Sequence, residues 1–68
     1  MEGNVLRGVV AEKFGSCSKF ADALGWSGRK TRDIVSGRQE PNAKDIKQMA
    51  DTLGINEPKE FMRVFFQA

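Results

Sequence analysis

Apolar residues recur along this chain at the spacing of an α-helix, and glycines interrupt the pattern at short intervals. The first amphipathic segment ends at Gly15. Its apolar positions follow i, i+4 spacing in two neighbouring rows: Val5, Leu6, Val9, Val10 and Phe14. Gly3 and Gly8 each lower the helix propensity of this segment by up to ~1 kcal/mol relative to alanine. We therefore expect packing of the apolar stripe to stabilise this helix.

Two shorter helices are predicted next, joined by a turn. The second helix covers residues 17–24, with Ser16 as its N-cap and Gly25 at its end. Its apolar positions are Phe20, Ala21 and Leu24. The third helix begins after a second candidate N-cap, Ser27, and stops near Gly37. Glycine suits such stops because it adopts the left-handed backbone conformation without steric cost.

The last two helices are marked at their starts by a cap and by a proline. Asn42 is the predicted N-cap of the fourth helix, and Gly54 ends it. Asp45 lies in the first turn, where a carboxylate interacts favourably with the helix dipole. The apolar positions of this helix are Ile46, Met49, Ala50 and Leu53. Pro58 suits the first turn of a fifth helix, which carries Phe61, Met62, Val64, Phe65 and Phe66.

The overall pattern predicts one small helical domain. No segment alternates apolar and polar residues as a β-strand would, and no repeat or interdomain linker is visible. We predict an all-α fold, a compact five-helix bundle in which residues 1–68 form a single domain. The N-terminus lacks a secretory pattern, and no apolar run approaches the ~18 residues of a membrane span. We therefore expect a cytoplasmic protein.

The composition excludes several kinds of chemistry. Cys17 is the only cysteine, and the chain has no histidine or tyrosine. An intrachain disulfide, a Cys–His nucleophilic pair and a zinc site with nitrogen or sulfur ligands cannot be assembled. We expect a protein that is not an enzyme and that uses no cofactor, metal or small-molecule ligand. A thiol at a helix N-terminus could serve as a redox sensor, but without a second cysteine we favour a packing role for Cys17.

The positive charge of the chain is local rather than large. The formal net charge is only +2, yet residues 26–47 hold six basic and three acidic residues, a net of +3 that leaves −1 for the remainder. Arg29, Lys30 and Arg32 fall within four consecutive positions. A run of charges is often only a solvated helix face. On a nearly neutral body, however, a local cationic surface is typical of a binding site for a polyanion.

The second and third predicted helices, joined by Gly25-Trp26-Ser27, have the spacing of a helix-turn-helix. Ala21 is small enough for the next helix to cross closely, and Ile34 faces the core and fixes the angle of that helix. The segments SCSKFADALGWS and IKQMADTLGI, the recognition segment that continues through Ile34 to Gly37, and Pro41 resemble the phage repressor and Cro class of Xre-like helix-turn-helix domains. This resemblance covers nearly the whole chain.

The resemblance implies that the second helix lies across the phosphate backbone while the third enters the major groove of duplex DNA. It assigns to base edges the positions Gly28, Arg29, Arg32 and Asp33. It assigns to the DNA backbone the positions Cys17, Ser27, Lys30, Ser36, Gly37, Arg38 and Lys44. Arg29 and Asp33 are spaced i, i+4, so Asp33 either forms an exposed ion pair or orients the Arg29 guanidinium toward guanine.

Four positions depart from the family pattern. Cys17 replaces a glutamine that contacts phosphate in many members, and Trp26 replaces a smaller aliphatic residue in the turn. Thr31 stands where an apolar residue usually faces inward, and we expect it to loosen the third helix. Val35 stands where an acidic residue is frequent, and we expect it to contact Val10 instead.

The leading interpretation is a sequence-specific double-stranded DNA-binding transcriptional regulator, a small prophage protein that resembles Cro or repressor and is located at the nucleoid. We expect a homodimer, formed through Phe61, Phe65 and Phe66, on a pseudo-palindromic operator. One alternative is a helix-turn-helix-derived protein-interaction module, an adaptor or antirepressor that does not bind DNA. A second is an RNA-binding KH domain, because residues 25–28 fit its GxxG loop, although that fold also needs a sheet.

Overall fold

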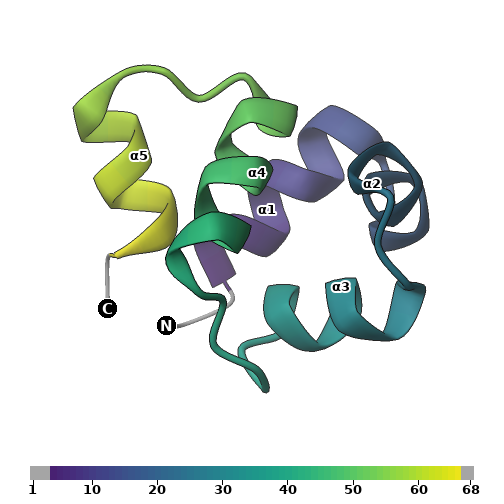
Figure 1. Cartoon of the computed structure of the whole chain (residues 1–68). Helices are drawn as coiled ribbons and strands as arrows, with labels where there is room; N and C mark the ends of the chain where they lie inside the picture. The colour runs from purple at the N-terminus through teal and green to yellow at the C-terminus, as the bar shows by residue number, and fades with distance from the viewer. Residues whose placement is uncertain (1–3, 67–68) are drawn as a thin grey trace.

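Five α-helices follow one another along the chain in the computed structural model, which describes residues 4–66. They are α1 (Asn4–Phe14), α2 (Cys17–Leu24), α3 (Gly28–Val35), α4 (Ala43–Leu53) and α5 (Pro58–Phe65) (Figure 1). The predicted all-α architecture is confirmed, since residues 4–66 contain no strand. Gly3, expected to weaken the first helix, lies outside the described residues.

Three helices begin at the side-chain caps that the sequence predicts. The Ser16 hydroxyl accepts from the Lys19 backbone N–H at 3.2 Å, and the Ser27 hydroxyl accepts from that of Lys30 at 3.1 Å. Asn42 forms a reciprocal capping box, accepting from the Asp45 N–H at 2.8 Å while its own N–H donates to the Asp45 carboxylate at 3.3 Å. These bonds satisfy backbone donors that have no partner within the helix.

The chain reverses between α2 and α3 at Gly25. The backbone of Gly25 is left-handed, with φ of 76°, and its N–H donates to the Ala21 carbonyl at 2.9 Å. The N–H of Trp26 donates to the same carbonyl at 3.1 Å. Because only glycine adopts this conformation freely, the turn is short and lets α3 pack directly against α2.

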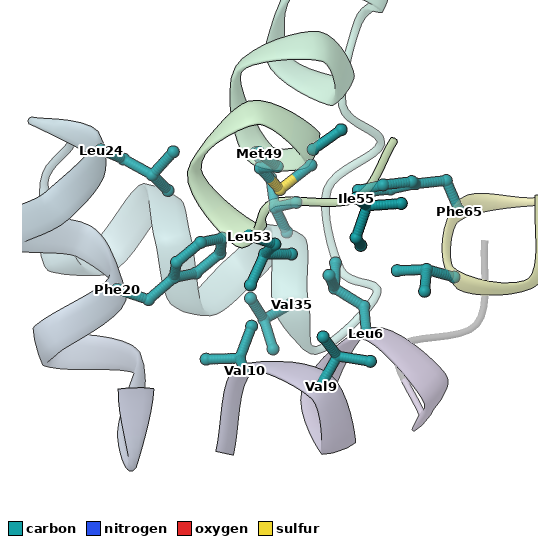
Figure 2. Packing of buried hydrophobic residues seen from close by; sticks show 13 residues of the cluster. Leu6, Val9, Val10, Phe20, Leu24, Val35, Met49, Leu53, Ile55 and Phe65 are labelled. Atoms are coloured by element: carbon teal, nitrogen blue, oxygen red, sulfur yellow. The ribbon is translucent and has the colours of Figure 1, made fainter. Parts of the chain in front are cut away.

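Helix α1 occupies the centre of the molecule, and the other four helices pack on it (Figure 1). All five helices contribute side chains to one apolar core. Ten of its members are labelled in Figure 2: Leu6, Val9, Val10, Phe20, Leu24, Val35, Met49, Leu53, Ile55 and Phe65. Val35 and Val10 belong to this same cluster and point toward each other (Figure 2), which agrees with the predicted apolar contact.

Thr31 is completely buried, yet its hydroxyl has a partner. Thr31 Oγ1 donates to the Ser27 carbonyl at 2.9 Å, one helical turn back. A buried hydroxyl is costly only when it lacks a hydrogen bond. The Thr31 hydroxyl is therefore satisfied within the helix, and the effect of Thr31 on the stability of α3 stays a prediction.

Helix α5 has one face in the core and another in solvent. Phe65 is 2% exposed and packs in the core, whereas Met62 and Phe66 are 56% and 55% exposed. Phe61 is half-buried between them, with its ring centroid 5.1 Å from Phe65 and 5.8 Å from Phe66. Of the three phenylalanines expected at a subunit contact, Phe65 thus cannot reach a partner while the core is closed.

Candidate nucleic-acid interface

Helix α3 lies along one edge of the molecule, with its first turn directly after the Gly25 turn (Figure 1). Its inner face is buried and consists of Thr31, Ile34 and Val35. Arg29 and Arg32 are both exposed on the outer face. The apolar inner face therefore fixes the helix, while the two guanidinium groups remain accessible to a ligand.

Gly28 opens α3 and is exposed. A Cβ atom placed on it would meet no other atom of the protein within 4 Å, and its φ is not positive. The fold therefore does not require glycine at this position. A role for Gly28 in allowing close approach to a ligand is compatible with this geometry.

Asp33 is half-buried at the far end of α3, and its backbone organises the loop that follows. The Asp33 carbonyl accepts from the Arg38 N–H at 2.8 Å, the Gln39 N–H at 3.1 Å and the Ser36 hydroxyl at 3.2 Å. Among residues 4–66, no ion pair joins the carboxylate of Asp33 to the Arg29 guanidinium. The i, i+4 ion pair considered from the sequence is thus not formed.

The loop after α3 brings three more of the expected contact residues beside the end of that helix. Ser36 and Gly37 are half-buried, and Arg38 is exposed. Gly37 has a left-handed backbone with φ of 87°, so the chain turns sharply there. The side chain of Arg38 is added in this way to the exposed cations of α3.

Lys30 differs from its two arginine neighbours because its side chain is directed to α4. Its Nζ lies 3.3 Å from Asp45 Oδ1 and 4.2 Å from the centroid of the Trp26 ring. The Lys30 side chain is 37% exposed, against 12% for that of Asp45. An ammonium group at this distance from an indole face makes a cation–π contact, so Lys30 is already engaged within the protein.

Gln48, on α4, is a site-supporting residue that the sequence does not reveal. Its Nε2 donates to the Leu24 carbonyl at 2.7 Å, and its Oε1 accepts from Trp26 Nε1 at 3.3 Å. These partners are 24 and 22 positions away, so no local spacing indicates the contacts. The ion pair of Asp45 with Lys30 was missed for the same reason, although the capping role of Asp45 agrees with its predicted place in the first turn of the helix.

The remaining predicted contacts lie at helix starts. Cys17, at the start of α2, carries a free thiol, is half-buried and packs against the core. Ser27 and Lys44 are exposed at the starts of α3 and α4. The Ser27 hydroxyl already accepts the capping bond of α3.

The electrostatics of this region are cationic. The exposed basic side chains of α3, the following loop and the α4 start are Arg29, Arg32, Arg38 and Lys44. Of the three acidic residues in this region, Asp45 is paired with Lys30, while Asp33 and Glu40 reduce the net positive charge. Such a set of basic side chains can neutralise phosphates and, through the arginines on a projecting helix, form bidentate hydrogen bonds.

Within residues 4–66, no three histidine, cysteine, aspartate or glutamate side chains are grouped so that they could hold a metal ion. No helix in this range is long and apolar enough to cross a lipid bilayer. The chain matches no protein-family model, no curated protein and no solved structure. Functional inference therefore depends on the geometry described above.

Proposed function

We propose that this chain is a sequence-specific double-stranded DNA-binding transcriptional regulator built on a repressor- and Cro-like helix-turn-helix, formed by α2, the Gly25 turn and α3. One observation carries the proposal. Helix α3 is fixed by a buried inner face while Arg29 and Arg32 extend from its outer face. A cationic helix that projects from a compact body is the element that fits the major groove of B-DNA, which is about 12 Å wide.

In this proposal, base recognition comes from the outer face of α3. Arg29 and Arg32 donate pairs of hydrogen bonds to the N7 and O6 atoms of guanine. Asp33 is close enough along the helix to orient Arg29 once DNA is bound, or to accept from a cytosine amino group. Gly28 lets the helix start approach the groove wall because no side chain intervenes.

The DNA backbone is contacted from both sides of α3. Arg38 and Lys44 are exposed and supply charge to phosphates, which gives affinity without sequence information. Ser36 and Gly37 approach the same strand through the loop, and Ser27 and Cys17 do so at the starts of α3 and α2. The regulator acts by occupying its operator and excluding RNA polymerase or a competing regulator.

We also propose that the protein binds DNA as a homodimer, with half-sites about 34 Å apart on a pseudo-palindrome. The exposed Met62 and Phe66 on α5 are the apolar side chains available for the subunit contact. The half-buried Phe61 ring contacts the Phe66 ring and helps to hold it in place.

The test is salt-dependent binding to duplexes selected from a random library. With about four phosphate contacts, affinity should fall roughly 100-fold between 50 and 200 mM salt. Replacing Arg29 and Arg32 together by alanine should abolish selection of a consensus. The matched control replaces Arg7 and Lys13, exposed on α1, which removes the same charge away from α3 and from the proposed subunit contact and should leave the consensus unchanged.

One observation favours a second candidate, a helix-turn-helix-derived adaptor or antirepressor that binds a protein rather than DNA. Met62 and Phe66 expose more than half of their apolar side chains, while the net charge of the chain is only +2. A flat salt response together with no mobility shift on any duplex would favour this candidate and contradict the DNA-binding proposal.

A further inference from the structure

Four polar or aromatic side chains join the Gly25 turn and the start of α3 to α4. We call Trp26, Lys30, Asp45 and Gln48 the turn clamp. The Lys30 ammonium contacts both the Asp45 carboxylate and the Trp26 ring, and Gln48 bonds the Trp26 indole and the end of α2. The clamp thus connects three consecutive elements of the proposed DNA-binding region.

The clamp includes a link between α3 and α4, two helices whose backbones make few close contacts. Helix α3 packs on α2 and α1, whereas α3 and α4 meet through the shared apolar core and through the Lys30–Asp45 ion pair. Asp45 is itself fixed, because its second oxygen accepts from the Asn42 N–H in the capping box. The carboxylate that receives Lys30 is therefore held at the start of α4 rather than free to move.

Each charged residue of the clamp is next in sequence to a proposed DNA contact. Lys30 follows Arg29 on α3, and Asp45 follows Lys44 on α4. For Arg29 to reach bases while Lys44 reaches a phosphate, the two helix starts must keep a fixed separation. The Lys30–Asp45 contact joins the two helices at this point.

We propose that the turn clamp sets the position of α3 relative to α4 and that Lys30 is a positioning residue for DNA recognition rather than a phosphate ligand. This inference rests on the proposed function. It revises the role that the family resemblance assigns to Lys30. A phosphate would compete with the Asp45 carboxylate and the Trp26 indole for the Lys30 ammonium.

The substitution Asp45→Asn tests the proposal by the direction in which DNA affinity changes. Asparagine keeps an oxygen for the Asn42 N–H but removes a negative charge close to the proposed DNA surface. Simple electrostatics, with Lys30 released to bind phosphate, predicts tighter binding. The clamp predicts weaker binding, by about threefold or more, because α3 loses its fixed position.

Trp26 provides a spectroscopic readout that does not need DNA, since it is the only tryptophan in the chain. Lys30→Met and Asp45→Asn should both shift its indole N–H resonance in a folded protein. Lys30→Arg should restore the wild-type DNA affinity, because a guanidinium can contact carboxylate and indole together. The control is Lys44→Met, which removes an exposed lysine outside the clamp and should leave the indole resonance in place.

Binding by Asp45→Asn that is equal to or tighter than wild type would overturn the proposal, as would an unchanged indole resonance in Lys30→Met. If the wild-type protein binds no duplex, the proposed function fails, and the clamp is judged separately by a double-mutant cycle. In that cycle, Lys30→Met and Asp45→Asn should be non-additive by at least about twofold in the unfolding equilibrium constant. Additivity would then overturn the clamp itself.

Discussion

Helices α3 and α5 are both eight residues long, and each buries one face while exposing the other. The exposed faces differ in chemistry. Helix α3 shows Arg29 and Arg32, whereas α5 shows Met62 and Phe66. Two helices of the same length and amphipathic design thus present surfaces for opposite kinds of partner, one suited to a polyanion and one to an apolar surface.

The two helices are also anchored differently. Helix α3 begins with a side-chain cap at Ser27, packs on two helices and is connected to a third by the turn clamp. Helix α5 packs mainly on α1 and begins at Glu57, which makes no side-chain capping bond. A recognition element needs a fixed orientation, whereas an apolar contact tolerates adjustment. This difference agrees with the roles proposed for the two helices.

The largest expected effect on stability comes from removing a buried side chain of α5. Phe65→Ala should cost ~3–5 kcal/mol of the free energy of unfolding, because it leaves a cavity in the core. A domain of this size has only about 3–10 kcal/mol of stability in total, so the variant should unfold at a much lower urea concentration than the wild type. Urea denaturation followed by circular dichroism measures the loss. Phe66→Ala is the matched control and should cost less than ~1 kcal/mol; equal costs would contradict the two-faced description of α5.

On α3 the effect should appear in recognition and not in stability. Arg29→Ala should lower discrimination among bases by ~1–3 kcal/mol while changing the free energy of unfolding by less than ~0.5 kcal/mol. Lys44→Ala should instead weaken binding to all duplexes equally. Selection from a random duplex library, repeated for each variant, separates the two outcomes. An unchanged consensus for Arg29→Ala would refute its role at base edges.

The apolar surface of α5 should reveal itself in self-association. Phe66 and Phe61 also border a groove of about 280 Å³ between α4 and α5, whose other apolar lining includes Ile46 and Ile55. Stable interfaces bury ~800 Å² on each partner, more than two exposed side chains supply, so we expect a weak dimer in free solution. Sedimentation of Phe66→Lys should show monomer at concentrations where the wild type associates. Association of both proteins to the same extent would place the contact elsewhere.

The smallest expected effect is that of a substitution in α1, outside both α3 and α5, and it serves as a reference for the others. Gly8 is exposed within α1, and a Cβ atom there would meet nothing within 4 Å. Gly8→Ala should therefore raise the free energy of unfolding by ~0.5–1 kcal/mol, through helix propensity alone. Thermal unfolding measures this gain, and DNA affinity should not change. A loss of stability would mean that α1 does not accommodate a side chain at position 8, despite the open space around Gly8.

The sequence was sufficient for features that depend on neighbours along the chain. Ser16, Ser27 and Asn42 were all identified as caps, because a cap and the backbone N–H that donates to it are three residues apart. The left-handed stops at Gly25 and Gly54 were found for the same reason. The five helices and most of the core followed from these local signals.

Features that depend on distant neighbours were not predictable. The sequence assigned Phe61, Phe65 and Phe66 together to a subunit contact and did not show that Phe65 lies inside and Phe66 outside. Gln48 on α4 contacts the turn between α2 and α3, and no periodicity in the sequence indicates these contacts.

The packing of α5 on α1 has a consequence for the nascent chain on the ribosome. Leu6 and Val9 are synthesised early, yet they share one core with Phe65, which is synthesised some sixty residues later. Until that late segment emerges, part of α1 has no apolar neighbour and remains available to chaperones or proteases. A premature stop codon ahead of α5 should thus yield a short-lived product, even though every residue proposed to contact DNA would already have been translated.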